Sequence, residues 1–154
     1  MFDKILISRC LLGENVRYNS EIISLKHTLL NLWQQQNRFI PICPEVAGGL
    51  PVPREPAEIQ LSENLITTIS GQDVSKQFHR GAQLALTLCQ QHHIRFALLK
   101  ESSPSCGSTH IYDGSFTNQK ILGQGVTSKL LTQAGIKVYS ENNLAELAAM
   151  LDKA

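Results

Sequence analysis

The sequence predicts an α/β fold, a three-layer, doubly wound and mostly parallel sheet of the Rossmann or flavodoxin type, with a small β-hairpin insertion. Short apolar runs alternate with helical patterns along most of the chain, and this alternation is typical of a parallel sheet covered by helices on both faces. With 154 residues, the chain is long enough to bury one sizeable core. We therefore expect a single domain spanning residues 1–154.

Four apolar runs predict the strands of the sheet. They cover residues 4–10, 38–43, 94–100 and 136–140 and are rich in Ile, Leu, Val or Phe. Short apolar runs between helical segments are typical of strands that are buried on both faces. Right-handed crossovers would then place helices on both sides of the sheet.

Apolar residues at helical spacing predict helices in the segments between these strands. Apolar residues recur every three or four positions from about Glu21 to Gln36, with Ser20 as the N-cap. Asp73 is expected to cap a second helix that ends near His92. Residues 123–135 and 143–154 predict two more helices. The expected inner faces of the first two helices are Ile22, Leu25, Leu29, Leu32 and Trp33, and Val74, Phe78, Ala82, Ala85, Leu88 and Cys89.

Three segments do not fit the alternation. Residues 44–56 hold four of the six prolines and two glycines, which indicates an ordered loop. Residues 57–72 resemble a small β-hairpin or arm whose role the sequence does not reveal. Residues 110–117, "HIYDGSFT", carry an Asp-Gly turn that is typical of a second hairpin.

Composition excludes several classes of protein. The net charge is +1, from 14 basic and 13 acidic residues, so a nucleic-acid polymer is not expected as a partner. No apolar run is long enough to span a membrane, and the first residues do not resemble a secretory signal. These features predict a cytoplasmic protein that acts on a small molecule and whose four cysteines are thiols or ligands rather than disulfides.

Three of the cysteines are expected to converge. Cys10 ends the first predicted strand, Cys43 ends the second, and Cys106 follows the third. Because ligand sites in open parallel sheets lie at the carboxyl ends of the strands, all three thiols should reach one rim. Thiolates suit zinc, copper(I) and iron–sulfur clusters, and an incomplete ligand set leaves a position for substrate. Cys89 is expected to pack in the core.

Two polar residues accompany these thiols. Glu45 lies two positions after Cys43 and could act as a general base. Ser103, in the loop "ESSPSCGS", could reach the same substrate. Two other interpretations stay open on residues alone. In the first, Cys106 is a nucleophile with His79 or His110 as its base; in the second, the three cysteines and His110 form a structural zinc site.

Five blocks resemble a bacterial family long described as a domain of unknown function and now associated with thiouracil desulfidases. In chain order they are "SRCLLGENVRY", "CPEVAGGLPVPREPAEI", "DVSKQFHRGA", "LLKESSPSCGSTHIYDGSF" and "GQGVTSKLL…GIKVYSE". The resemblance covers nearly the whole chain, and the blocks that carry the cysteines are the most specific.

The resemblance implies a cofactor, a substrate and roles for named residues. A [4Fe–4S] cluster would be held by Cys10, Cys43 and Cys106, leaving one iron for the sulfur of a thiocarbonyl substrate. Glu45 and Ser103 match the positions of the family's catalytic carboxylate and hydroxyl. The implied reaction converts 2-thiouracil and water to uracil and hydrogen sulfide without net redox change.

Overall fold

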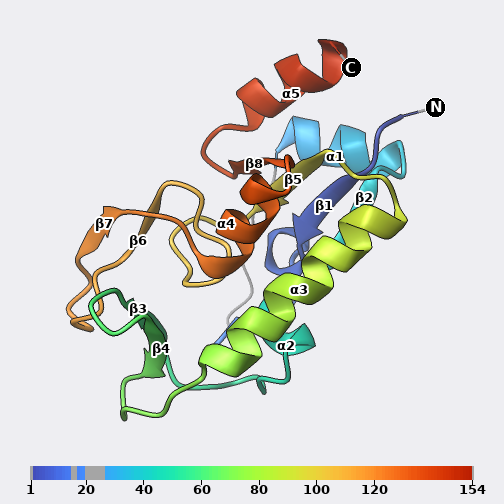
Figure 1. Cartoon of the computed structure of the whole chain (residues 1–154). Helices are drawn as coiled ribbons and strands as arrows, with labels where there is room; N and C mark the ends of the chain where they lie inside the picture. Colours follow the sequence, from blue (N-terminus) through green and yellow to red (C-terminus); the bar gives the residue numbers. More distant parts are fainter. Residues whose placement is uncertain (1, 15–16, 20–26, 154) are drawn as a thin grey trace.

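A four-stranded parallel sheet forms the centre of the computed structural model, which describes residues 2–14, 17–19 and 27–153 (Figure 1). Its strands are β1 (Ile5–Ser8), β2 (Phe39–Ile42), β5 (Phe96–Leu99) and β8 (Lys137–Ser140), in the order β2-β1-β5-β8. All four predicted strands are confirmed. The chain moves from β1 to β2 on one side and then to β5 on the other side of β1. The topology therefore reverses at the carboxyl ends of β1 and β5.

Helices cover both faces of this sheet, as the sequence predicts. Side chains that alternate along β1 separate two cores: Ile5 and Ile7 face α1 (Thr28–Gln35) and α5 (Leu144–Lys153). Leu6 faces the opposite core, which contains residues of α3 (Ser75–Gln91) and α4 (Val126–Gln133). The fold is thus α/β with three layers, and no helix in the described part of the chain is both long and apolar enough to cross a bilayer.

The first predicted helix differs from its expectation. Its start near Glu21, its N-cap Ser20 and the inner-face residues Ile22 and Leu25 lie outside the described residues. Within them, α1 begins at Thr28, and it buries Leu30 and Trp33 rather than Leu32, which is 44% exposed. A helix this short contacts the sheet along one narrow stripe, and positions 30 and 33 occupy it.

The second helix agrees with its prediction, except that Val74 rather than Asp73 occupies the N-cap position. The Asp73 carboxylate accepts a hydrogen bond from the backbone N–H of Ser75 at 2.9 Å, which satisfies one of the unpaired donors at the start of α3. The predicted inner face is buried, except for the half-buried Leu88. Cys89 packs in the core between α3 and the sheet, as expected.

Two antiparallel hairpins lie together at one end of the molecule (Figure 1). The hairpin β3 (Ala57–Gln60) and β4 (Leu65–Thr68) confirms the prediction for residues 57–72. The predicted second hairpin is also present, since β6 (His110–Tyr112) pairs with β7 (Lys120–Leu122). Its strands are joined by residues 113–119 rather than by the Asp-Gly turn alone. Residues 113–119 form a longer loop because Gly114 and Phe116 donate their backbone N–H groups to Glu58 of β3.

Two short helical turns lie where the sequence predicts the end of the first strand and an irregular loop. Cys10 lies in the 3₁₀ turn η1 (Arg9–Leu12), which Gly13 ends in the left-handed conformation. Cys43 is the N-cap of α2 (Pro44–Ala47), in a segment predicted as irregular. Proline suits the first position of a helix, where its missing N–H would have no partner.

Candidate functional site

A cavity of about 530 Å³ lies beyond the carboxyl ends of β1, β2 and β5. The two hairpins form part of its wall through Glu58, Thr68, Tyr112, Asn118 and Lys120. The five site residues selected from the sequence all line it: Cys10, Cys43, Glu45, Ser103 and Cys106. The cavity lies at the reversal of sheet topology, where ligand sites occur in open α/β sheets.

Cys43 is positioned by close packing of α2 on α3. A Cβ added to Gly81 would stand 1.9 Å from the carbonyl oxygen of Pro44, and one added to Gly48 would stand 1.9 Å from that of Gln77. Glycine at both positions therefore lets the two backbones touch. This contact fixes the start of α2, and with it the directions of Cys43 and Glu45.

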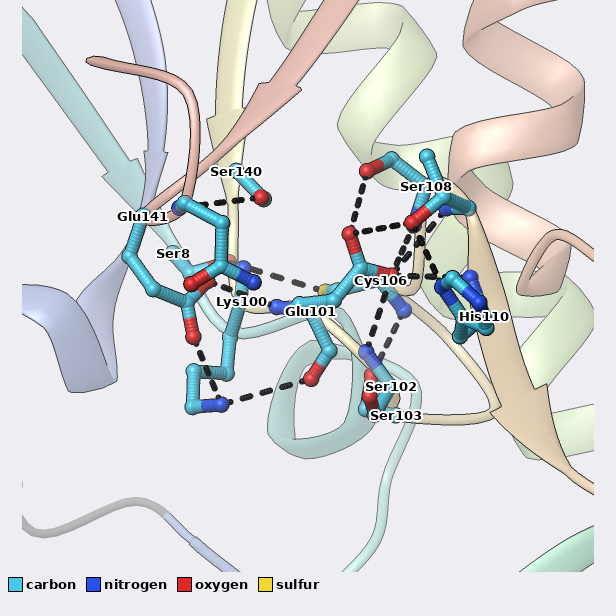
Figure 2. A network of polar contacts seen from close by, with 12 residues as sticks. Ser8, Lys100, Glu101, Ser102, Ser103, Cys106, Ser108, His110, Ser140 and Glu141 are labelled. Atoms are coloured by element: carbon cyan, nitrogen blue, oxygen red, sulfur yellow. Dashed lines mark hydrogen bonds and ion pairs between the residues drawn. The ribbon is translucent and has the colours of Figure 1, made fainter. Parts of the chain in front are cut away.

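Three serine hydroxyls form hydrogen bonds with Cys106, each with a different atom of the cysteine. Its backbone N–H donates to Ser103 Oγ at 2.6 Å, and its carbonyl accepts from Ser128 Oγ at 2.7 Å. Its sulfur accepts from Ser8 Oγ at 3.6 Å (Figure 2). Ser103 therefore stiffens the loop in addition to lining the cavity. Because its oxygen is the acceptor in the bond to Cys106, its hydroxyl proton can still be donated to another group.

The start of α4 closes the same loop. The backbone N–H groups of Val126 and Thr127 donate to the carbonyls of Pro104 and Ser105 at 2.9 and 2.8 Å. The motif "GQG" before this helix is compatible with an anion site in sequence. In the structure these donors bind the Cys106 loop instead, so the helix start supports a cysteine rather than an anion.

Burial controls the acidity of the three thiols. It raises the pKa of Cys10 to about 12, with Cys43 adding to the rise, while Lys100 and Arg17 oppose it. Burial also raises the pKa of Cys43, although backbone N–H groups of α2 favour its thiolate. Burial and then Glu45 raise the pKa of Cys106, and the Ser8 hydrogen bond lowers it. The thiols are close enough to affect one another, and a cationic group among them would offset these penalties.

Glu101 organises the loop that carries Cys106, a role that the sequence did not reveal. Its Oε1 accepts the backbone N–H groups of Ser102, Ser108, Thr109 and His110 at 2.9–3.1 Å. Its Oε2 accepts the hydroxyl of Ser108 at 2.7 Å (Figure 2). It also accepts the hydroxyl of Thr109 at 3.1 Å. Burial alone would raise the pKa of Glu101, but these bonds lower it to about 2. A buried carboxylate thus ties together the two ends of the loop.

Glu45 forms a largely buried ion pair with Arg54. The guanidinium donates to Glu45 Oε2 through Nε at 3.1 Å and through Nη2. Arg54 also donates to the carbonyl of Pro51 at 3.0 Å, which holds the proline-rich loop in place. Within the described part of the chain, both bonds to the carboxylate end on Oε2, so Oε1 is the oxygen available to a water in the cavity.

Basic side chains surround the thiols. Arg9, Arg17, Arg54 and Lys100 all line the cavity, as their positions near the strand ends suggest. Arg9 pairs with Glu14 at 3.2 Å. Lys100 pairs with Glu141 at 2.7 Å rather than with the Glu101 carboxylate. Arg9, Arg54 and Lys100 are thus each paired with a carboxylate. Basic and acidic side chains are therefore mixed around the thiols, since Glu45, Glu55, Glu58 and Glu101 also line the cavity.

The histidines do not join the thiols. His79 and His110 are exposed, and the His110 ring contacts Thr109 Oγ1 at 3.0 Å. Among the described residues no histidine lines the cavity, which leaves Cys106 without the base that a nucleophile would need. In the same part of the chain, no three Cys, His, Asp or Glu side chains are close enough to bind a single metal ion. The nucleophile and zinc interpretations therefore gain no support.

Comparison with known proteins identifies the family. The model described as 2-thiouracil desulfurase matches residues 5–143 of this chain. The chain belongs to the 2-thiouracil desulfurase family. A solved structure described as the [4Fe–4S]-dependent thiouracil desulfidase TudS is 49% identical, with a TM-score of 0.95 and 99% of both chains covered. The uncharacterized protein YbbK of Bacillus subtilis (strain 168) is 42% identical over 152 residues, which cover 93% of this chain and 99% of YbbK. The resemblance seen in the sequence is confirmed.

The donor set of the cavity fits an iron–sulfur cluster. Three thiols border one space, and thiolates are the usual ligands of such clusters. A four-iron cluster is larger than one ion, so its ligand sulfurs stand farther apart than those around a single zinc. Each thiol would lose its proton on binding, because thiolates are the ligating form. The donor set, three thiols on the wall of one cavity, thus suits a cluster with three cysteine ligands.

Proposed function

We propose that this chain is a desulfidase that converts 2-thiouracil and water to uracil and hydrogen sulfide at a [4Fe–4S] cluster held by Cys10, Cys43 and Cys106. The observation that carries the proposal is the convergence of these thiols and Glu45 on one cavity, in a member of the 2-thiouracil desulfurase family. Free thiols of this kind persist in the cytoplasm, where we expect the protein to act on a small molecule.

The cluster supplies Lewis acidity when it is bound. Cys10, Cys43 and Cys106 would hold it, and an iron without a protein ligand would polarise the C=S bond of the substrate and make the ring carbon electrophilic. The net reaction replaces sulfur by oxygen from water, so no electron donor or acceptor is needed.

Glu45 is the proposed general base. Arg54 holds its Oε2, and among the described residues no other group bonds to the carboxylate. Oε1 can therefore accept a proton from the attacking water. Because the ion pair also fixes the carboxylate in one orientation, Arg54 is a positioning residue for this step.

Ser103 is the proposed hydrogen-bond donor to the substrate. A lone pair of its oxygen accepts the Cys106 N–H at 2.6 Å, so the hydroxyl proton is not used in this bond. Its place on the cavity wall near Cys106 lets it donate to a ring nitrogen or pass on a proton. The same contact makes its position depend on the cysteine beside it.

The test is anaerobic reconstitution with iron and sulfide, followed by assays of uracil and sulfide release from 2-thiouracil. We expect turnover by the wild type and none by Cys106→Ser. Replacing Glu45 with Gln should leave the iron bound and slow turnover by about 10²–10⁴-fold, the usual contribution of a general base. The matched control is Glu63→Gln, at the exposed turn between β3 and β4. Robust turnover by metal-free Cys106→Ser protein would refute the proposal.

A further inference from the structure

Ser8 is a polar residue in an otherwise apolar strand. The three residues before it in β1, Ile5, Leu6 and Ile7, are fully buried aliphatic side chains. Ser8 is also buried, with 3% of its surface exposed. Strand alternation directs it to the same face as Leu6, whose core also contains Cys106. A hydroxyl at this position needs partners, because an unpaired buried polar group is costly.

The partners of Ser8 determine the direction of its hydroxyl proton. The backbone N–H of Lys100 can only donate, and it donates to Ser8 Oγ at 3.0 Å. The hydroxyl has one proton, and the sulfur of Cys106 lies 3.6 Å away (Figure 2). When Cys106 is a thiolate ligand, its sulfur has no proton and can only accept. The bond therefore runs from Ser8 to the sulfur, and the charge of the acceptor strengthens it.

We infer that Ser8 is a positioning residue whose hydroxyl donates to the ligand sulfur of Cys106 and so tunes the cluster as well as orienting the ligand. The inference rests on the proposed function, since it requires the cluster. A hydrogen bond to a ligand sulfur withdraws electron density from it, and such bonds help to set the reduction potential of iron–sulfur clusters. Partners of this kind also support metal retention.

A merely structural role for Ser8 makes a different prediction. Ser8 could serve only to satisfy Lys100 N–H where β5 ends. Its loss would then lower stability but leave the electronic properties of the cluster unchanged. Ser128 provides the matched comparison, because its hydroxyl is buried and bonds to the carbonyl of Cys106 rather than to the sulfur.

The experiment compares the anaerobically reconstituted wild type with Ser8→Ala, Ser8→Thr and Ser128→Ala. Iron content, the midpoint potential of the cluster and the rate of iron loss to a chelator are measured for each protein. We expect Ser8→Ala to shift the potential to a lower value and to lose iron about tenfold faster, the lower end of the usual effect of such partners. Ser8→Thr, which keeps the hydroxyl, should restore both properties. Ser128→Ala should retain the wild-type potential.

A wild-type potential in iron-loaded Ser8→Ala, or an equal shift in Ser128→Ala, would overturn the inference while leaving the proposed function intact. If the wild type itself binds no iron, the proposed cluster and the role of Ser8 fall together. If Ser8→Ala does not fold, NMR spectroscopy of the cluster-loaded wild type with selectively labelled serine tests whether Ser8 donates to the ligand sulfur. A Ser8 hydroxyl proton bonded to a ligand sulfur has a hyperfine-shifted NMR resonance, and its absence would contradict the inference.

Discussion

Replacing Glu101 with Gln tests whether a buried carboxylate holds the Cys106 loop. The change keeps the shape of the side chain but removes the charge that favours four backbone N–H groups on Oε1 and two hydroxyls on Oε2. Hydrogen bonds to charged groups are stronger than those to neutral ones. The variant should therefore fold with a less stable loop.

The size of the effect follows from the acidity of Glu101. Its pKa falls from an ordinary value of 4.5 to about 2 in the folded protein. A difference of about 2.5 between folded and unfolded pKa values corresponds to about 3 kcal/mol of stability at neutral pH. Because the folded pKa is the lower one, this contribution is complete above about pH 4.5 and disappears as the pH falls towards 2.

Chemical denaturation at pH 7 measures this contribution against Glu63→Gln, the same substitution at an exposed site. We expect Glu101→Gln to lose about 3 kcal/mol and the control to stay within about 0.5 kcal/mol of the wild type. Below pH 4.5 the difference in the free energy of unfolding between the wild type and Glu101→Gln should become smaller. Acid release of the cluster affects both proteins and cancels in this difference. Equal stability of the two Gln variants at pH 7 would refute the reasoning.

Two further substitutions test how the cysteines are placed. Gly81→Ala should destabilise the protein by about 1–3 kcal/mol and reduce its iron content. The new Cβ would stand 1.9 Å from the carbonyl oxygen of Pro44 and would displace α2 together with Cys43. Full iron content in this variant would contradict the expectation. Cys89→Ala should lower the free energy of unfolding by about 1 kcal/mol, as is usual for a core substitution, and should leave iron content and turnover unchanged; loss of iron would show that Cys89 is a ligand.

The convergence of the cysteines could be predicted from the sequence because it depends only on topology. Once the strands before Cys10, Cys43 and Cys106 are recognised as parallel, their carboxyl ends must meet at one edge of the sheet. Small errors in the strand ends do not affect this argument. Cys10 lies in a 3₁₀ turn and Cys43 caps a helix, yet both still reach the cavity.

The partners of the site residues could not be predicted, because they depend on how the loops fold. Arg54 lies next to Glu55 in the sequence, but the path of the proline-rich loop brings it to Glu45 instead. Glu101 binds backbone N–H groups that only the folded loop brings together. Its signal in the sequence is an acidic residue directly after a buried strand, followed by a loop rich in serine, threonine and glycine.

The hairpins also contain contacts that could not be predicted from the sequence. A strong Asp-Gly signal at residues 113–114 predicts a tight turn, but Glu58 of the other hairpin binds Gly114 and Phe116. A contact between distant segments therefore overrides a local preference. The arm at residues 57–71, which had no assigned role in the sequence, forms part of the cavity wall and holds the second hairpin.

Quantification of iron and acid-labile sulfide in the anaerobically reconstituted protein tests the central claim most directly. The account predicts about four irons and about four sulfides per chain in the wild type and in Cys89→Ala, as a [4Fe–4S] cluster requires. It predicts loss of both in Cys10→Ser, Cys43→Ser and Cys106→Ser. A single zinc per chain, or a metal-free wild type that still releases sulfide from 2-thiouracil, would contradict it.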